Sequence, residues 1–110
     1  MSFLTLDQLP FAGISHEFVG ETQGAPFSAY ILTAKPGQGP PLHKHPYVEV
    51  AFVVEGSATI TVGEETREVK AGGLVVIPAN TPHRFENSGR ERLRQIDIHA
   101  SPNFIQTDLA

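Results

Sequence analysis

The sequence predicts an all-β fold, either a sandwich or a barrel of short strands, on three observations. Residues 48–54 are apolar at nearly every position, which is typical of a strand buried on both faces. Residues 58–62 alternate apolar and polar side chains, as a half-buried strand does. Turn signals rich in Gly, Pro and Asn recur about every eight to twelve residues, and no long stretch has a helical period.

Further short strands are expected on both sides of this pair. They cover residues 16–19, 27–33, 66–69, 74–77 and 93–99, and one more begins at His83. Residues 1–12 carry several large apolar side chains, so we interpret them as an N-terminal arm docked on the body, with a helical turn at residues 6–9. Residues 101–110 form a C-terminal tail. The chain is expected to be one domain, residues 1–110.

Composition excludes several classes of protein. The chain has no cysteine, so neither a disulfide framework nor a thiolate metal site is available. The formal charge is −4 without a basic cluster, which argues against nucleic acid as a partner. Asp7 interrupts the apolar start of the chain, so we expect no secretory signal. No apolar run is long enough for a membrane span, and a cytoplasmic protein is the expectation.

Three residues with metal-binding side chains follow the Gly- and Pro-rich segment 36–41. They are His43, His45 and Glu49, separated by two and then four positions. Positions of equal parity on an extended strand project from the same face, and Pro46 disfavours a helix. We therefore predict that the three donors converge on one side of a strand.

The region resembles the cupin family in two ordered motifs. The first motif is matched by Gly37, His43, His45, Glu49 and Gly56, and the second by Gly72, Pro78, His83 and Asn87. One position departs from the family pattern, because Asn80 stands where a glycine is usual. Asparagine tolerates positive φ better than most residues, so we expect the turn to be kept. The resemblance covers about residues 28–100 and implies a small antiparallel jelly-roll β-barrel.

The resemblance also implies a metal site with four ligands, namely His43, His45, Glu49 and His83. Imidazole and carboxylate ligands suit one divalent ion of Fe, Mn, Ni, Co, Cu or Zn. Four ligands leave room on such an ion for a substrate or dioxygen. The alternative is that these residues are polar core residues of a cupin that has lost its metal. That alternative would leave a buried carboxylate and three imidazoles poorly compensated.

Two classes of function remain open from the sequence. One is a metal-dependent enzyme of the dioxygenase-like type, acting on a small organic molecule, with Glu49 as a catalytic base. The other is a metal-containing module that binds a small ligand without turnover, and a metal-dependent isomerase or lyase is a further possibility. We expect a mainly apolar pocket walled by Ala51, Val53 and Phe85, and hence a weakly charged substrate without a phosphate.

The last expected strand has two faces of different character. Gln95, Asp97 and His99 share one face, and Ile96 and Ile98 share the other. Either the polar row faces the mouth of the barrel, or the isoleucines face the core and the polar row lies in solvent or in a subunit contact. We favour the second arrangement.

Four other residues have less distinctive sequence signals. His16 stands alone and is interpreted as a surface or interface side chain. Arg84 should point away from the metal, because it follows His83 on a strand. Tyr47 and Phe85 either line the pocket or fill the core.

A homodimer is expected from the strand that carries Glu49. If Glu49 faces the metal, Val48, Val50, Phe52 and Val54 form an apolar opposite face that needs a cover. A second copy of the chain could provide this cover. The alternative is that the arm and the tail of the same chain fold back over the face, which would leave a monomer.

Overall fold

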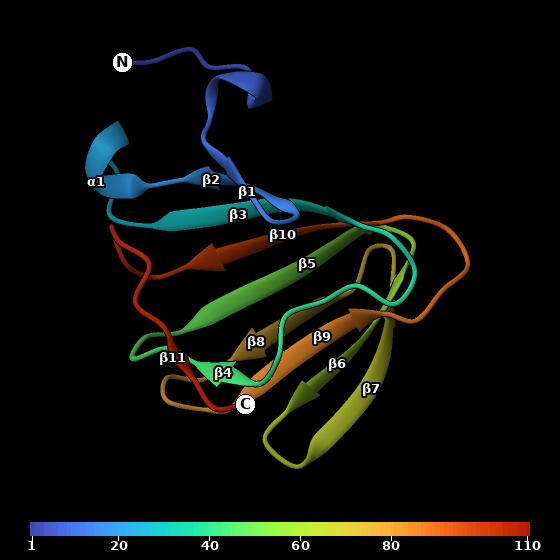
Figure 1. Cartoon of the computed structure of the whole chain (residues 1–110). Helices are drawn as coiled ribbons and strands as arrows, with labels where there is room; N and C mark the ends of the chain where they lie inside the picture. The colour runs from blue at the N-terminus through green and yellow to red at the C-terminus, as the bar shows by residue number, and fades with distance from the viewer.

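The computed structural model describes residues 1–110, which form two antiparallel sheets facing each other (Figure 1). The larger sheet has the order β1-β2-β3-β10-β5-β8, and the smaller has the order β11-β4-β9-β6-β7. The larger sheet contains β1 (Phe11–Ala12), β2 (Ser15–Phe18), β3 (Ser28–Ala34), β5 (Glu49–Glu55), β8 (Leu74–Ile77) and β10 (Leu93–His99). The smaller contains β4 (His43–Lys44), β6 (Ser57–Val62), β7 (Glu65–Lys70), β9 (His83–Asn87) and β11 (Thr107–Asp108).

The predicted all-β class is confirmed, and its form is jelly-roll-like. Strands far apart in sequence are neighbours, since β10 pairs with both β3 and β5, and β9 pairs with both β4 and β6. The helical content is limited to the 3₁₀ turn η1 (Leu6–Gln8) and the short α1 (Gly20–Gln23). No helix has both the length and the apolar character needed to cross a membrane.

The hydrophobic core lies between the two sheets and occupies only part of that space. Its buried members include Leu32, Val53, Ile60 and Leu93, which come from β3, β5, β6 and β10. The rest of the space between the sheets is lined by buried polar residues. The apolar core therefore joins the sheets while leaving room for a cavity.

Two turn positions confirm the expected backbone conformations. Asn80 has φ 60° and is the single non-glycine residue with positive φ, as the substitution in the second motif predicted. Gly56 has φ 87°, and a Cβ there would lie 2.5 Å from the carbonyl oxygen of Arg92. A side chain at Gly56 is thus excluded both by backbone strain and by the close approach of the β10 entry.

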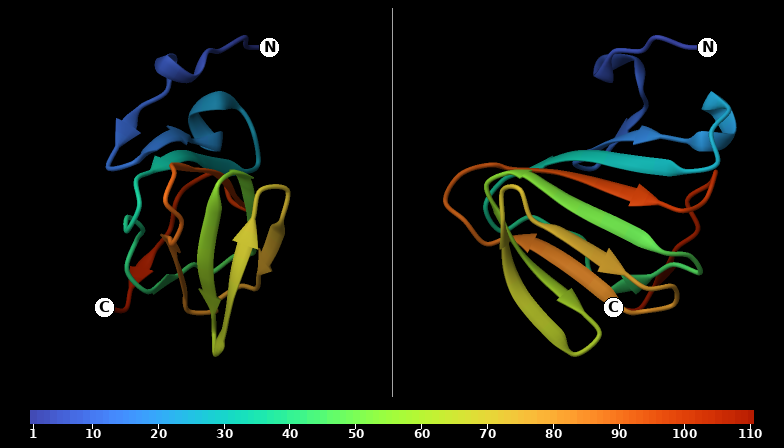
Figure 2. Two further views of the ribbon diagram at one scale, coloured as in Figure 1. Left: turned by 90° about the vertical axis from the view of Figure 1, so that its right-hand side faces the viewer. Right: turned by 180° about the vertical axis from the view of Figure 1, so that it is seen from behind.

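The two ends of the chain behave differently. The arm contains the expected helical turn, but only its end, Phe11–Ala12, joins the body as β1. The residues before it project from the body instead of docking on it (Figures 1 and 2), and Phe3 is 86% exposed. The tail returns to the body, where β11 pairs with β4. Neither segment covers the outer face of β5.

The strand β5 is buried on one face only, contrary to the sequence expectation. Glu49, Ala51 and Val53 are buried, whereas Val50 and Phe52 are half-buried and Val54 is exposed. The continuous apolar run predicted a strand covered on both sides. In the single chain, nothing covers the second side.

Candidate metal centre

The four predicted ligands come together, but from three strand regions and both sheets. His43 lies on β4, His45 follows that strand directly, and Glu49 opens β5 in the other sheet. His83 opens β9 and pairs with His43. The expectation that one strand presents the first three donors was therefore wrong, because the chain turns at Pro46 and changes sheet. The four side chains converge because the two sheets face each other.

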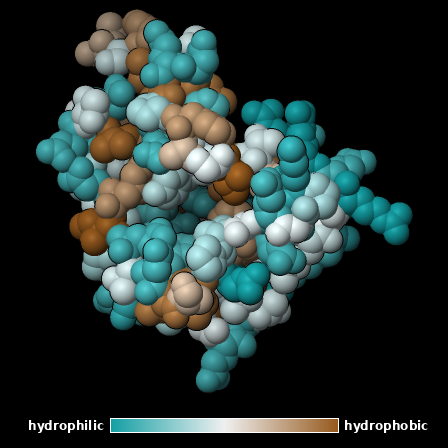
Figure 3. Space-filling model, viewed as in Figure 1, coloured by the Kyte–Doolittle hydropathy of each residue, from teal (hydrophilic) through white to brown (hydrophobic).

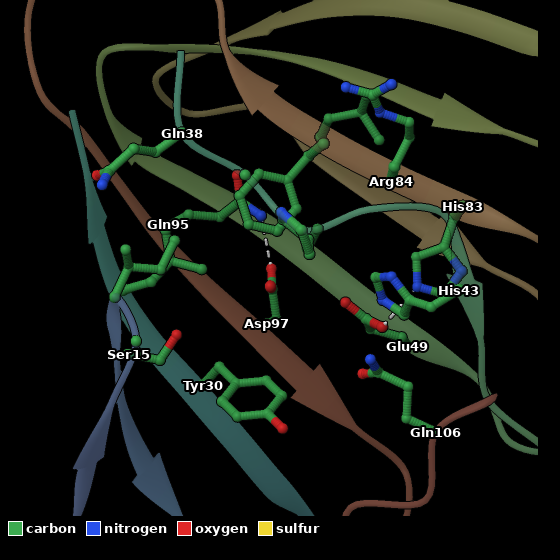
Figure 4. Close-up of a pocket in the computed structure, with 18 of the residues that line it drawn as sticks. Ser15, Tyr30, Gln38, His43, Glu49, His83, Arg84, Gln95, Asp97 and Gln106 are labelled. Atoms are coloured by element: carbon green, nitrogen blue, oxygen red, sulfur yellow. Dashed lines mark hydrogen bonds and ion pairs between the residues drawn. The ribbon is translucent and has the colours of Figure 1, made fainter. Parts of the chain in front are cut away.

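The cluster is buried and compact. All four residues are at most 6% exposed, and their potential ligand atoms lie within 4.8 Å of one another. The carboxylate oxygen Oε1 of Glu49 is 3.2 Å from Nε2 of both His45 and His83. Figure 4 shows Glu49 beside His43 and His83 at one end of a cavity.

The backbone fixes the orientation of each ligand imidazole. The Nδ1 atoms of His43, His45 and His83 lie 2.8 Å from the carbonyl oxygens of Pro41, Ile105 and Thr81, respectively. A carbonyl only accepts, so each Nδ1 carries the proton and donates it. Each Nε2 then offers a lone pair to the cluster, which is the tautomer that a metal requires.

This tautomer assignment makes the donor set fit a cation. With Nδ1 protonated, a neutral imidazole cannot donate from Nε2, so the 3.2 Å contact of His83 Nε2 with Glu49 Oε1 requires either a second proton on the ring or a cation beside the two atoms. The Nε2 of His45 is buried without a hydrogen-bond partner, although Glu49 Oε1 is only 3.2 Å away. Lone pairs and a negative charge gathered out of water need a positive charge, and a divalent metal ion supplies it.

The electrostatics of the cluster keep its carboxylate ionised. Burial alone would raise the pKa of Glu49, but hydrogen bonds with the imidazoles of His45 and His83 outweigh burial and lower it to about 2. A metal ion in place of the protons in these hydrogen bonds would act in the same direction. Burial lowers the pKa of His43. At His83 burial acts in the same direction, but Glu49 outweighs it and raises the pKa. At neutral pH, Glu49 is available as an anionic ligand or as a proton acceptor.

His99 belongs to the site, which the sequence analysis did not predict. Its Nδ1 is 2.7 Å from the Tyr47 hydroxyl, and its Nε2 is 3.5 Å from Glu49 Oε1. The backbone N–H of Ile105 donates to the same tyrosine oxygen. Burial lowers the pKa of His99 to about 4, so the ring is neutral at pH 7. Tyr47 therefore orients His99, and His99 can donate from Nε2 toward the carboxylate.

The favoured prediction for β10, with the isoleucines in the core and the polar row outside, was wrong. Gln95, Asp97 and His99 are buried and line the cavity, whereas Ile98 is exposed on the outer face. The register explains this, because His99 pairs with Glu49 and Asp97 with Ala51. Once Glu49 faces inward, its partners on β10 must also face inward. The signal available in the sequence was the shared parity of the three polar residues.

The cavity is more polar than expected. It has a volume of about 430 Å³ and 22 lining residues, of which 8 are hydrophobic. Ala51 and Phe85 line it as predicted, but Val53 lies in the core. Tyr47 acts through His99 and is not part of the lining. Arg84 reaches the rim with its guanidinium directed away from His43 (Figure 4). Figure 3 shows a hollow on this face, with hydrophilic residues inside it.

Comparisons with known proteins agree with this geometry. The model of the cupin domain matches residues 30–99. An uncharacterized protein of Streptomyces coelicolor is 43% identical over 58 residues, which are 53% of this chain and 54% of that protein. The acireductone dioxygenase of Alcanivorax borkumensis is 35% identical over 77 residues, covering 62% of this chain and 42% of the enzyme. The oxalate decarboxylase of Lactobacillus farciminis, solved as a formate complex, superposes with a TM-score of 0.81 at 24% identity, over 94% of this chain and 34% of that one.

The fold and the buried His/His/Glu/His cluster thus define a cupin with a site suited to a metal ion. The family match extends over more than half of the sequence, and the chain belongs to the cupin family. It spans about half the length of the curated relatives it matches.

Proposed function

We propose that this cupin binds one divalent transition-metal ion through His43, His45, Glu49 and His83, and that it is a metal-dependent enzyme of the dioxygenase-like type acting on a small organic molecule. The observation that carries the proposal is the set of three imidazole Nε2 lone pairs directed at a buried, ionised carboxylate. The similarity to an acireductone dioxygenase supports the choice of reaction class.

The metal, when bound, would supply Lewis-acid or oxygen chemistry at the end of the cavity. The residues of the chain contribute orientation and proton transfer. Three backbone carbonyls hold the imidazoles in one tautomer. Glu49 is exposed to the cavity and ionised, so it can accept a proton from a bound molecule. His99 and Tyr47 keep the carboxylate oriented for this role.

The size of the cavity favours a small substrate. A volume of about 430 Å³ lies at the lower end of the range for small-molecule sites. Arg84 is the only lysine or arginine in the lining, and its Nη2 is 3.4 Å from Glu86 Oε2. Apart from the proposed metal ion and this exposed arginine, a phosphorylated molecule would find no cationic side chain in the cavity.

Elemental analysis of protein purified without a nickel column tests the proposal. We expect one equivalent of metal per chain, and iron, manganese or copper would favour the oxygenase reaction. The Fe(II)-loaded protein should also bind nitric oxide, an analogue of dioxygen, as detected by electron paramagnetic resonance. Metal well below one equivalent, even after reconstitution, would refute the proposal. Stoichiometric metal that does not bind nitric oxide would favour a module that holds a ligand without turnover.

A further inference from the structure

A second polar pair lies on the cavity wall, apart from the metal ligands. Gln95 and Asp97 are adjacent inward-facing positions of β10, and their side chains are 1% and 3% exposed. The Gln95 amide Nε2 donates to Asp97 Oδ1 over 2.7 Å. Figure 4 shows this pair within the cavity, separate from His43 and His83. Both residues line the space that a ligand would occupy.

The pair is incompletely satisfied within the protein. The Oε1 atom of Gln95 is buried and has no hydrogen-bond partner. The cross-strand neighbours of Gln95 are Leu32 on β3 and Val53 on β5, whose side chains have no donor to offer. An unpaired buried acceptor destabilises a protein, so its retention beside a cavity indicates a donor that arrives from outside.

The Asp97 carboxyl also favours a ligand that donates a hydrogen bond at this part of the cavity. It is buried beside the Gln95 amide, with Tyr30 and Ala51 as its cross-strand neighbours. No lysine or arginine makes an ion pair with it. A ligand carboxylate at this position would lose its hydration without a cationic partner, whereas a hydroxyl or amino group can donate to a carboxyl oxygen of Asp97.

The distance along β10 sets the length of the ligand. His99 contacts the metal cluster through Glu49, and Asp97 and Gln95 precede it by two and four residues. At about 3.4 Å per residue, these positions lie roughly 7 and 14 Å from His99 along the strand. A molecule with polar groups at two ends can therefore reach the cluster and this pair together.

We propose that Gln95 and Asp97 form the specificity-determining end of the cavity, which recognises a hydroxyl or amino group of a ligand whose other end lies at the metal cluster. The ligand class is then a small bifunctional molecule with a metal-binding group and a non-anionic, hydrogen-bond-donating group. Dicarboxylates are disfavoured, because their second carboxylate would meet Asp97 without a cationic partner. This inference rests on the proposed function for the position of the metal-binding end.

Three catechols that differ only in the far substituent test the proposal. 4-Ethylcatechol has no far polar group, 4-(2-hydroxyethyl)catechol has a donor, and 3,4-dihydroxyphenylacetate has a carboxylate. Their dissociation constants are measured by calorimetry without oxygen on the Zn(II)-loaded protein, which cannot oxidise them. We expect the hydroxyethyl compound to bind roughly 3- to 10-fold tighter than the ethyl compound, as one added hydrogen bond gives. The carboxylate should bind at least about 10-fold more weakly than the ethyl compound.

Two cavity variants and one control assign these preferences to the pair. Gln95→Leu should remove the preference for the hydroxyethyl compound while leaving ethyl binding within about 2-fold. Asp97→Leu removes the carboxyl oxygens and should lower the preference for the hydroxyethyl compound to within about 2-fold. Glu68→Gln is the matched control, since Glu68 lies on the exposed strand β7, outside the cavity, with Lys70 two residues away as its partner. The control should keep all three wild-type affinities.

The possible results distinguish a failure of this proposal from a failure of the proposed function. Equal binding of the ethyl and hydroxyethyl compounds, or tightest binding of the carboxylate, would overturn the proposal in a protein that holds zinc. A preference that survives in Gln95→Leu would also overturn it, because the preference would then arise elsewhere. If the chain binds no metal, the proposed function fails. The same affinity ratios, measured by nuclear magnetic resonance titration of the metal-free protein, still decide the role of the pair.

Discussion

The two faces of the strand pair β5–β10 differ in chemistry and in burial. The inner face presents Glu49, Gln95, Asp97 and His99, all buried. The outer face presents apolar residues across three neighbouring strands, namely Val50 and Phe52 of β5, Leu74 and Val76 of β8, and Ile96 and Ile98 of β10. Leu74 is 62% and Val76 is 65% exposed. Four polar side chains are thus buried on the inner face beside the apolar Ala51 and Val53, while the apolar side chains of the outer face are half-buried or exposed, a partial reversal of the pattern of an ordinary sheet.

This reversal indicates that neither face is complete in the single chain. A buried carboxylate facing three lone pairs is costly unless a cation joins it. An exposed apolar surface across three strands forgoes the free energy of burial and promotes association. We therefore propose that the inner face binds a metal ion and a small ligand, and that the outer face is covered by a protein surface.

The largest effect is expected from removing a ligand on the inner face. His45→Ala removes the imidazole whose Nε2 is buried without a partner. Metal affinity should fall by more than about 100-fold, beyond the loss typical of an outer-shell change. Equilibrium competition with a chromophoric chelator measures this loss.

His16→Ala is the matched control for that variant. His16 lies on β2, where it pairs with Ile31 of β3 and packs its ring against Phe11 at 4.9 Å between centroids, and it is not among the cluster residues. The control should retain wild-type metal content. Equal metal content in both variants would show that the four-residue cluster does not hold the ion.

The next effect concerns the outer face, which we propose is covered by a second copy of the chain. The arm projects from the body and the tail packs at β4, so neither covers this face. Burying one side chain of this kind contributes roughly 1.5 to 3 kcal/mol. Phe52→Glu places a charge in the centre of the patch and should weaken the dimer at least about 100-fold, which at micromolar concentration gives a monomer by light scattering.

Thr66→Glu introduces the same charge on the exposed strand β7 of the other sheet. It should leave the dimer intact. A wild-type mass near that of one chain, 11.9 kDa, would contradict the proposed dimer directly.

The sequence predicted which four residues would come together, because the two cupin motifs carry both residue type and spacing. It also predicted the backbone of the second motif, since Asn80 takes the positive φ that a glycine would have taken. These features are local, so neighbouring positions in the chain were enough to find them.

The orientation of β10 depends on pairing with a strand that is distant in the sequence, and it was predicted wrongly. Hydrophobicity placed Ile96 and Ile98 inside, but the pairing of His99 with Glu49 sets the inward parity. That pairing joins residues 50 positions apart, and the sequence alone did not identify it. The role of Ile105 was missed for the same reason, because its carbonyl oxygen accepts from His45 but lies in the distant C-terminal tail. Periodicity identifies two faces of a strand, whereas the partner strands decide which face is inside.

A smaller effect should follow from removing the tail, which supports the inner face from outside. Ile105 accepts from His45 and donates to Tyr47, and Phe104 stacks on Tyr30 at 4.0 Å between ring centroids. A chain ending at Asn103 should bind metal roughly 10- to 100-fold more weakly, the usual loss for an outer-shell partner. Deletion of Ala110 alone should have no effect. Unchanged affinity in the longer truncation would show that the carbonyl of Ile105 does not orient His45.

The smallest effect is a change in the pH dependence of stability at Asp97. Burial raises its pKa well above 3.8, and the charge of Glu49 acts in the same direction. Between the unfolded and the folded pKa, the folded state binds one more proton, so the free energy of unfolding falls as pH rises. Asp97→Asn lacks this proton. On metal-free protein, the variant should therefore gain stability over wild type as pH rises above about 4, by at most about 1.4 kcal/mol per pH unit.

Urea denaturation at a series of pH values measures that difference. Asp108→Asn is the control, because Asp108 lies in an exposed hydrogen-bonded pair with Gln106. Its plot of unfolding free energy against pH should run parallel to that of the wild type. The inner face lacks a partner for Asp97 only if the stability gain of Asp97→Asn over the wild type grows with pH. A gain that stays constant with pH would mean that the Asp97 carboxyl is already compensated within the fold, and the contrast between the two faces would then be one of composition alone.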